Sequence, residues 1–192
     1  MSNDVLGNFY HRILPHYQPR AEALLSNTTA NDLQKLTFRY IFTVDGMVTI
    51  SHMIEDLIIR NKRIADAHVS FQYFSRITPQ LERYQEVARS SKKLWLYGVP
   101  DAPLPELTNT TFINTQNTPL EHYWYVIAYG AGISATLLAE EITPANRMPG
   151  EPRIYEGFYT FEADTAFQVL TVLHQLFPKE VPAPIIPEML AE

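Results

Sequence analysis

Between residues 36 and 99 the sequence alternates three β-forming segments with two amphipathic segments of helical period. This alternation limits the possible folds more than any other feature of the chain. The β-forming segments span 36–44, 69–74 and 94–99, and the helical segments span 47–61 and 79–90. Thr78 with Pro79 is a typical helix start, and Pro100 ends the third strand. Short connections between alternating elements predict three adjacent parallel strands covered by two helices.

From Pro100 onward, further strands follow without helices between them. The sequence predicts strands at 111–113, 123–129, 134–142 and 155–161, and a final helix over 162–177. The connections between the last three strands are too short for crossover helices, which favours antiparallel pairing. We therefore expect an α/β fold: a mixed sheet with a parallel βαβαβ core, antiparallel strands after it, and helices packed on the sheet.

The two ends of the chain differ from its middle. An apolar helical stripe predicts an N-terminal helical extension over residues 1–32; its members are Leu6, Phe9, Tyr10, Ile13 and Leu14. Residues 33–177 are the expected main domain, and the proline-rich tail at 178–192 is expected to lack regular structure. A large apolar stripe is rarely left in water, so the extension either docks a partner or a second copy of the chain, or folds back onto its own domain.

Composition excludes several classes of function. The net charge is −6 and basic residues adjoin only at Lys62-Arg63 and Lys92-Lys93, so no nucleic acid is expected as a partner. The chain has no cysteine, which excludes disulfides, thiolate metal sites and cysteine nucleophiles. The N-terminus does not resemble a signal peptide and the apolar stretches are too short to span a membrane, so we expect a cytoplasmic protein.

Three polar side chains share one face of the predicted helix 47–61. His52, Glu55 and Asp56 are three and four residues apart, and such steps return to the same side of a helix. This face, predicted to lie opposite the apolar stripe, is either a metal or acid–base site, or it is solvated or hydrogen-bonded to a loop. Serine-hydrolase and metalloprotease patterns are absent from the sequence, and we assign no catalytic residue, metal or cofactor.

A glycine-containing segment at 130–135 matches a dinucleotide-binding pattern, G-x-G-x-x-A. The pattern requires a strand before it and a helix after it, near the start of a βαβ unit. It falls late in this chain, so a glycine hairpin is the favoured interpretation.

The carboxyl ends of parallel strands meet at one edge of a sheet, where α/β folds leave a crevice for ligands. The loops expected there carry the candidate ligand-binding residues Asp45, Phe74, Ser75, Arg76 and Asp101. Arg76 is the expected partner of an anion or carbonyl group, with the two aspartates orienting it. Alternatively, Arg76 pairs with an aspartate only to satisfy the loops.

Three stretches, in this order, resemble one family of domains. The first contains Ser51-His52-x-x-Glu55-Asp56, the second runs from Leu96 to Pro103, and the third contains Glu156, Gly157 and Phe161 with Tyr159 in place of the usual tryptophan. Together they resemble the DICT family, a sensory domain named for diguanylate cyclases and two-component systems.

The resemblance implies a sensory role and brings no catalytic residues with it. Such domains accompany cyclic-di-GMP enzymes, histidine kinases and light-responsive modules, often in cyanobacteria. We therefore expect a non-enzymatic regulator that acts on a signalling partner or through self-association as a homodimer, with or without gating by a small ligand. The alternative is a small-molecule-binding protein whose pocket lies at the carboxyl ends of the parallel strands.

Overall fold

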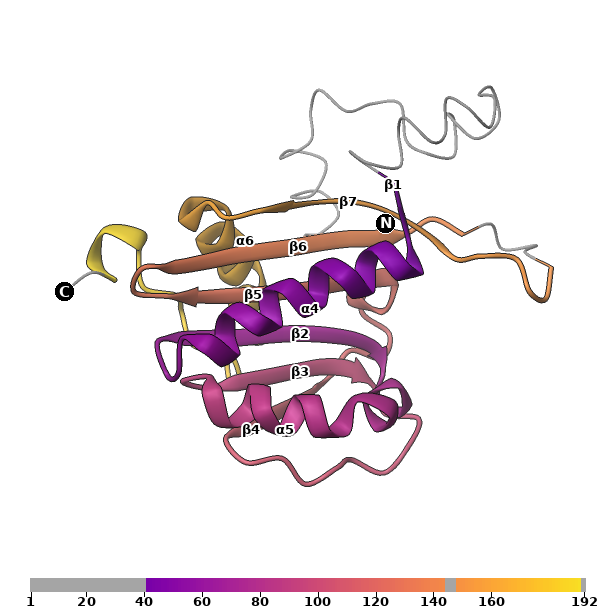
Figure 1. Ribbon diagram of the computed structural model, residues 1–192, viewed down its shortest axis with the longest axis horizontal. Helices are drawn as coiled ribbons and strands as arrows, with labels where there is room; N and C mark the ends of the chain where they lie inside the picture. Colours follow the sequence, from indigo (N-terminus) through magenta and orange to yellow (C-terminus); the bar gives the residue numbers. More distant parts are fainter. Residues whose placement is uncertain (1–40, 144–147, 191–192) are drawn as a thin grey trace.

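The computed structural model describes residues 41–143 and 148–190 (Figure 1). Their elements are, in chain order, β1 (Ile41–Thr43), α4 (Val44–Arg60), β2 (Ala65–Tyr73), η1 (Phe74–Gln80), α5 (Leu81–Ser90), β3 (Leu94–Val99), β4 (Thr110–Asn114), η2 (Pro119–His122), β5 (Tyr123–Gly130), β6 (Ile133–Glu141), β7 (Ile154–Thr160), α6 (Ala163–Leu176) and η3 (Pro187–Met189). The three η elements are 3-10 helices. The predicted N-terminal extension, 1–32, lies outside the described residues.

The strands form one mixed sheet in the order β1-β7-β6-β5-β2-β3-β4. β2, β3 and β4 are parallel, whereas β5 is antiparallel to β2 and the remaining pairs are antiparallel. The predicted mixed α/β fold and the antiparallel pairing of the last three strands are therefore confirmed. β2 is the strand at which the sheet changes from parallel to antiparallel.

The predicted place of the first strand is wrong. Residues 36–40 of the predicted strand lie outside the described residues; the described part, β1, pairs antiparallel with β7, with Ile41 opposite Glu156. Three strands separate it from β2, because α4 carries the chain diagonally across the sheet before β2 begins (Figure 1). The third parallel strand is instead β4, which pairs with β3.

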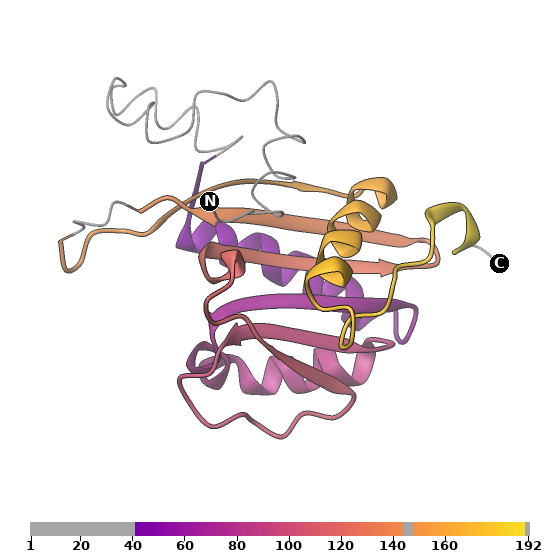
Figure 2. The same cartoon turned by 180° about the vertical axis from the view of Figure 1, so that it is seen from behind.

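Helices cover both faces of the sheet. α4 and α5 pack on one face, and their buried apolar residues share a core with β2, β3, β5 and β6. α6 packs on the opposite face, as Figure 2 shows, over an aromatic-rich core that includes Trp95, Tyr97 and Tyr125. The fold is thus a three-layer sandwich with the sheet in the middle. Among the described residues, no helix has both the length and the apolar character needed to cross a membrane.

The two helices before β3 begin at different places from those predicted. α4 starts earlier, at Val44, because the Thr43 side chain caps it by accepting a hydrogen bond from the Gly46 N–H at 3.2 Å. Thr78 is not an N-cap: it lies with Pro79 inside the 3-10 turn η1, and α5 begins only at Leu81. The 3-10 turn therefore leads from the end of β2 into α5.

The glycine-containing segment at 130–135 is a hairpin. β5 ends at Gly130 and β6 begins at Ile133, and these two residues face each other across the turn. Gly132 has a φ of 71°, a conformation that glycine adopts without steric cost. A strand rather than a helix follows, so the dinucleotide interpretation is wrong and the hairpin interpretation is confirmed.

The C-terminal segment 178–190 packs beside α6 across the sheet (Figure 2). Val181 is buried, the Trp95 Nε1–H donates to the Glu180 carbonyl at 3.0 Å, and the Tyr129 hydroxyl donates to the Ile185 carbonyl at 2.6 Å. The tail was expected to lack regular structure. It is largely irregular, as its prolines require, but it contains the short η3 turn and is held to the domain by side chains of the sheet.

Candidate functional site

A small cavity of about 50 Å³ lies between the first half of α4, the second half of β2 and the turn η1. Its polar lining includes Ser51, His52 and Glu55 from α4, Ser70 from β2, Arg76 from η1 and the indole of Trp124 from β5. We call it the motif cavity, because it brings three residues of the first sequence motif together with the candidate ligand-binding residue Arg76.

The motif residues facing this cavity are fixed by hydrogen bonds to other elements. The Ser51 hydroxyl accepts from the Trp124 Nε1–H at 3.1 Å, which ties α4 to β5. The His52 ring nitrogen Nε2 lies 3.2 Å from Gln80 Oε1, which ties α4 to η1. The helix that carries the motif is therefore fixed to both walls of the cavity.

Glu55 is a buried carboxylate, although the sequence predicted an outward polar face. Its two oxygens accept hydrogen bonds from the Tyr84 hydroxyl and the Arg83 guanidinium, both on α5. Arg83 also donates to Asp56 at 2.8 Å and to the His52 carbonyl at 2.8 Å. This polar face lies beside the apolar stripe rather than opposite it, because α4 packs against α5 as well as the sheet. Its contacts favour the hydrogen-bonding interpretation, with a helix rather than a loop as the partner.

The contact between α4 and α5 also shifts the pKa values of Arg83 and Tyr84. Burial of Arg83 disfavours its charged form, but the hydrogen bonds to Glu55 and Asp56 outweigh that effect and raise its pKa above the usual value. Burial raises the pKa of the Tyr84 hydroxyl, and the adjacent Glu55 carboxylate raises it further. Tyr84 therefore stays a neutral donor to Glu55 at any physiological pH.

A β-bulge near the end of β2 directs Gln72 toward the neighbouring strands. The pairing of β2 with β3 shifts between Ser70 and Gln72, so one residue is inserted there. Gln72 has a φ of 62°, which is unusual for a residue other than glycine. It is buried, and such strained backbone is found most often at functional sites.

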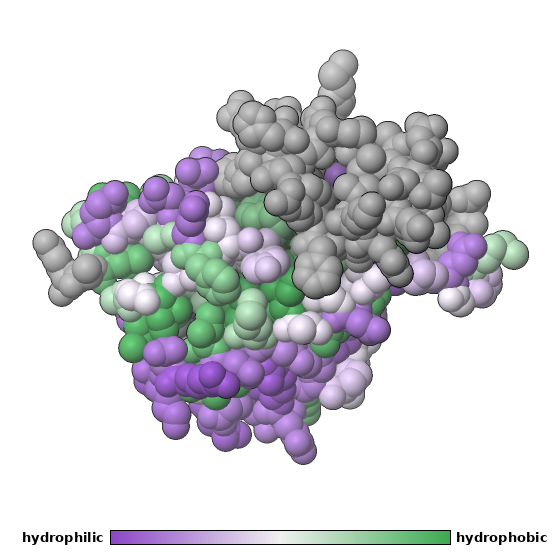
Figure 3. All heavy atoms as spheres, turned by 45° about the horizontal axis from the view of Figure 1, so that its top comes forward, coloured by the Kyte–Doolittle hydropathy of each residue, from purple (hydrophilic) through white to green (hydrophobic). Residues whose placement is uncertain are grey.

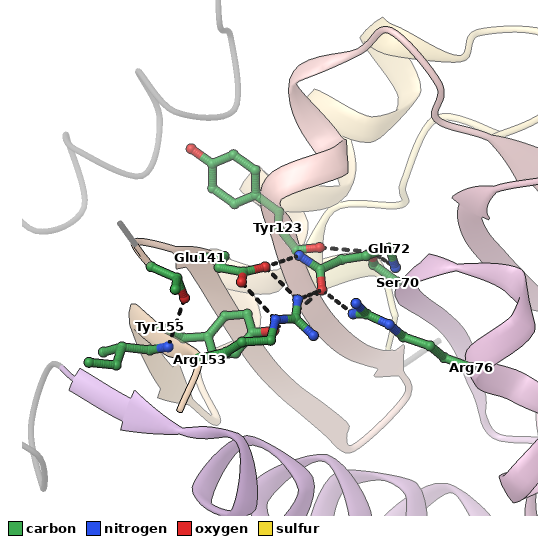
Figure 4. Close-up of polar contacts among 9 residues, drawn as sticks. Ser70, Gln72, Arg76, Tyr123, Glu141, Arg153 and Tyr155 are labelled. Atoms are coloured by element: carbon green, nitrogen blue, oxygen red, sulfur yellow. Dashed lines mark hydrogen bonds and ion pairs between the residues drawn. The ribbon is translucent and has the colours of Figure 1, made fainter. Parts of the chain in front are cut away.

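Gln72 is the centre of a polar cluster formed by strand ends (Figure 4). Its Oε1 accepts from Arg76 Nη1 at 2.5 Å, from Arg153 Nη2 at 2.6 Å and from the Tyr155 hydroxyl at 3.3 Å. Its Nε2 donates to Glu141 at 3.1 Å. Arg153 also donates to both carboxylate oxygens of Glu141. We call these five residues the Gln72 cluster; two guanidinium groups face a single carboxylate in it.

The pKa values of the cluster follow from this imbalance. Burial alone would raise the pKa of Glu141, but hydrogen bonds from Arg153 and Gln72 lower it to about 2. Burial lowers the pKa of Arg76, and the neighbouring charge of Arg153 lowers it further. Burial, with the Glu141 charge, raises the pKa of Tyr155 to about 12. The cluster thus has one more cation than carboxylate, and Glu141 forms its ion pair with Arg153 and not with Arg76.

The other predicted ligand-binding residues have different surroundings. Asp101 accepts hydrogen bonds from the Ser75 N–H at 2.8 Å and the Ser75 hydroxyl at 2.6 Å, and these bonds lower its pKa. Phe74 is buried against Phe112 and Gly98 in the core. Asp45 is exposed in the first turn of α4. Of the five, only Arg76 lines the motif cavity.

A second cavity, of about 180 Å³, lies on the opposite face of the sheet beneath the C-terminal segment. Asp66, His68, Lys92 and Tyr129 supply its charged or titratable side chains, and residues 181–185 cover it. None of the motif residues lines this cavity, which sets it apart from the motif cavity.

The third motif lies in β7 and just after it. Glu156 and Gly157 are buried, and a Cβ on Gly157 would stand 2.2 Å from the Leu138 carbonyl oxygen, so only glycine allows β6 and β7 to approach this closely. Phe161 is about half exposed and contacts Tyr159 edge to face at 6.4 Å. The third motif therefore contributes to strand packing and to the surface of the sheet, and it does not line the motif cavity.

Comparison with known families decides between the possible identities. The sequence model of DICT, described as a sensory domain in diguanylate cyclases and two-component systems, matches residues 25–142, more than half of the chain. The chain belongs to the DICT family. The suggested resemblance is confirmed, and with it a sensory type of domain. A search of curated proteins finds no match.

Among solved structures, a polyphosphate kinase from Porphyromonas gingivalis is similar to this DICT chain, with a TM-score of 0.43 and 14% sequence identity. The likeness covers 89% of this chain but only 26% of the kinase, so the chain spans about a quarter of that protein. A likeness of this degree says nothing about function.

The DICT match contains the first two motifs, whereas the third, at 156–161, lies outside the matched residues. The expected limits of the main domain, 33–177, stay a prediction. Sequence reasoning missed Gln72, Glu141 and Arg153. Glu141 directly precedes the segment 142–153, for which the sequence offered no interpretation, and Arg153 is its last residue. The only signal was that charged residues lie at both sides of an irregular stretch between two strands.

Proposed function

We propose that this DICT domain is a non-enzymatic regulator that binds a small ligand in the motif cavity and passes the binding event to a signalling protein. The proposed partner is of a kind named in the family description, a diguanylate cyclase or a two-component protein. Self-association through the N-terminal extension, a cytoplasmic location and a light-linked cyanobacterial pathway stay predictions.

One observation carries the proposal: the family motif and a candidate ligand-binding residue from a different element line the same cavity. Ser51, His52 and Glu55 come from α4, and Arg76 follows β2. Polar groups that converge on one cavity are typical of ligand sites. The cavity also adjoins the carboxyl end of the parallel strand β2, where α/β proteins commonly bind ligands.

The site is joined to the rest of the domain in a way that suits signalling. α4 contacts β5 through Ser51, η1 through His52 and α5 through Glu55. A ligand that displaced α4 by a small amount would therefore disturb contacts with several elements at once. Such packed contacts switch between discrete arrangements more readily than they deform.

Apolar surface is also available for a partner. Figure 3 shows hydrophobic side chains gathered in the middle of one face of the molecule, next to a hydrophilic lower part. At the end of β7, Tyr159 and Phe161 are both about half exposed. Exposed aromatic side chains of this kind are common in protein–protein contacts.

The test compares the wild-type chain with a variant whose cavity is filled. Val48 lines the motif cavity on α4, and Val48→Trp would occupy it; Thr49→Trp adds the same ring at an exposed neighbouring position. Each protein is purified from the native host, its bound small molecules are identified by native mass spectrometry, and its partner is captured by crosslinking with and without that molecule.

We expect the wild type and Thr49→Trp to retain the same small molecule and Val48→Trp to lose it, with partner crosslinking altered by the loss. A ligand retained equally by Val48→Trp, in a variant that melts like the wild type, would count against the motif cavity. A ligand lost without any change in crosslinking would favour the alternative function, a small-molecule-binding protein without a regulated partner.

A further inference from the structure

We propose that the ligand of the motif cavity is anionic, and that its carboxylate or phosphate head group binds to the guanidinium of Arg76. This inference rests on the proposed function, because it assigns a ligand class to the same cavity. It follows from the charge of Arg76, from the lining of the cavity, from the size of the cavity and from the backbone that holds Arg76 in place.

Arg76 is a partly buried cation that forms no ion pair with a carboxylate of the described residues. Arg76 Nη1 donates to a neutral amide oxygen, Gln72 Oε1, and the guanidinium lies over the Tyr73 ring at 5.0 Å from its centroid. The ion pairs of residues 41–143 and 148–190 involve Arg83, Arg89 and Arg153 but not Arg76. A guanidinium has five N–H donors in a fork that suits two oxygens of a carboxylate or phosphate, so most of its binding capacity is still available.

The nearest carboxylates are engaged by other donors. Glu141 accepts from Arg153 and Gln72, and both oxygens of Asp101 accept from Ser75. Glu55 also lines the cavity, but its two oxygens accept from Tyr84 and Arg83. A ligand anion would therefore meet Arg76 with these three carboxylates of the described residues already bound to other donors.

The cavity offers further polar contacts to a group bound at Arg76. Ser51, Ser70 and His52 line the same space, but the Ser70 hydroxyl already donates to the Tyr123 carbonyl and the His52 Nε2 faces Gln80 Oε1. The Ser51 hydroxyl accepts from Trp124 and can donate its own proton to an oxygen of a carboxylate or phosphate. The cavity volume of about 50 Å³ is a few times the roughly 10–15 Å³ that one water molecule needs in a cavity. Only a small anion or the head group of a larger ligand fits without rearrangement.

The backbone holds Arg76 where the anion would need it. The bulge in β2 places Gln72 in a strained conformation, and Gln72 Oε1 accepts from Arg76 and from Arg153 at the same time. One carbonyl oxygen has two lone pairs, so it cannot fully satisfy both guanidinium groups and the Tyr155 hydroxyl. An entering anion would replace Gln72 as the hydrogen-bond partner of the Arg76 guanidinium. Gln72 Oε1 would then accept only from Arg153 and Tyr155.

The experiment titrates the purified full chain with three probes at constant ionic strength: inorganic phosphate, succinate and neutral glycerol. Binding is followed by NMR of the arginine Nε–H signals and by thermal unfolding. The variants are Arg76→Gln, which removes the charge, and Arg89→Gln as a matched control on an exposed arginine of α5. Arg76→Lys keeps the charge without the fork and serves as a second variant.

We expect phosphate or succinate to bind the wild type and Arg89→Gln alike, to shift the Arg76 Nε–H signal and to raise the melting temperature. Loss of a charge-assisted hydrogen bond should weaken binding at least about tenfold in Arg76→Gln and less in Arg76→Lys. The probe that binds more tightly identifies the head group as phosphate or carboxylate.

Three results would overturn the inference: neither anion shifts the Arg76 signal, glycerol binds as well as the anions, or Arg76→Gln binds them as tightly as the wild type. If Val48→Trp nevertheless loses the host-derived ligand, the motif cavity is a ligand site and only its anionic character is wrong. If Val48→Trp keeps that ligand, the proposed function fails independently of these titrations. The response of the wild-type Arg76 Nε–H signal to the anions tests the inference even if Arg76→Gln does not fold.

Discussion

His68→Phe removes a buried imidazole from the centre of the sheet. His68 lies in β2, stacks on Trp95 with ring centroids 4.4 Å apart, and its Nδ1 lies 2.8 Å from the Tyr97 hydroxyl. Burial lowers the pKa of His68 from 6.5 to about 3, because charge is poorly solvated there. A phenyl ring keeps the stacking and cannot be protonated.

The pH dependence follows from the sign of that shift. In the unfolded chain His68 binds a proton below about pH 6.5, whereas in the folded chain it stays neutral down to about pH 3. Its contribution to stability is therefore complete above pH 6.5 and is lost as the pH falls toward the folded pKa. One proton bound only by the unfolded state costs about 1.36 kcal/mol per pH unit, so between about pH 7 and about pH 5 the loss is about 2 kcal/mol.

Urea unfolding at about pH 7 and about pH 5 measures this difference. We expect the wild type to lose about 2 kcal/mol more than His68→Phe over this range, even though the variant is less stable at neutral pH because Tyr97 loses its partner. His122→Gln, at an exposed position, is the control and should behave like the wild type. Parallel pH profiles for the wild type and His68→Phe would refute the reasoning.

Three further predictions concern the carboxylates and a glycine. Glu55→Gln should lower the free energy of unfolding by about 3 kcal/mol, because it breaks the buried ion pair with Arg83. Asp56→Asn breaks the more exposed ion pair of the same arginine and should cost under about 1 kcal/mol. Equal effects would contradict the assigned burial. Because the pKa of Glu141 is lowered from 4.5 to about 2, its contribution is present above about pH 4.5 and lost as the pH falls through 2. As the pH falls through this range, the wild type should therefore lose about 1–2 kcal/mol more of its free energy of unfolding than Glu141→Gln, after allowance for solvent screening. Acid unfolding followed by circular dichroism measures this difference, and superimposable acid profiles would argue against it. Gly157→Ala should destabilise by at least about 2 kcal/mol in urea, because the added Cβ meets the β6 backbone, whereas Gly46→Ala in α4 should be neutral or stabilising; a tolerated Gly157→Ala would show that the strands can separate.

The helices could be predicted from the sequence because their signals are local. Apolar residues at helical spacing predicted most of α4 and α6, and a proline marked the turn before α5. The partner of β1 could not be predicted, because β-forming residues do not indicate which distant strand they pair with. The strand-helix alternation predicts a nearby parallel partner, but here α4 crosses the sheet to β2 with three strands between.

The candidate site was predictable only as far as it follows single elements. Arg76 follows a strand and the α4 motif lies on one helix, so both could be named from the sequence. The Gln72 cluster could not, because the bulge depends on the register of β2 against β3. Glu141 and Arg153 meet Gln72 only through the complete strand order, which places the ends of β2, β6 and β7 together.

The position of β2 in the sheet has a consequence for the order of folding. β5, β6 and β7 are joined by close-range antiparallel pairings, whereas β2 reaches β5 only when residues 65–69 meet residues 126–130. Closing so long a loop costs entropy before any contact offsets it, so we expect the β5–β7 meander to form early and the β2–β5 seam to close late. Substitutions in the β5–β6 hairpin should then slow refolding, while those in β2 should mainly speed unfolding, and the reverse pattern in stopped-flow kinetics would contradict this order.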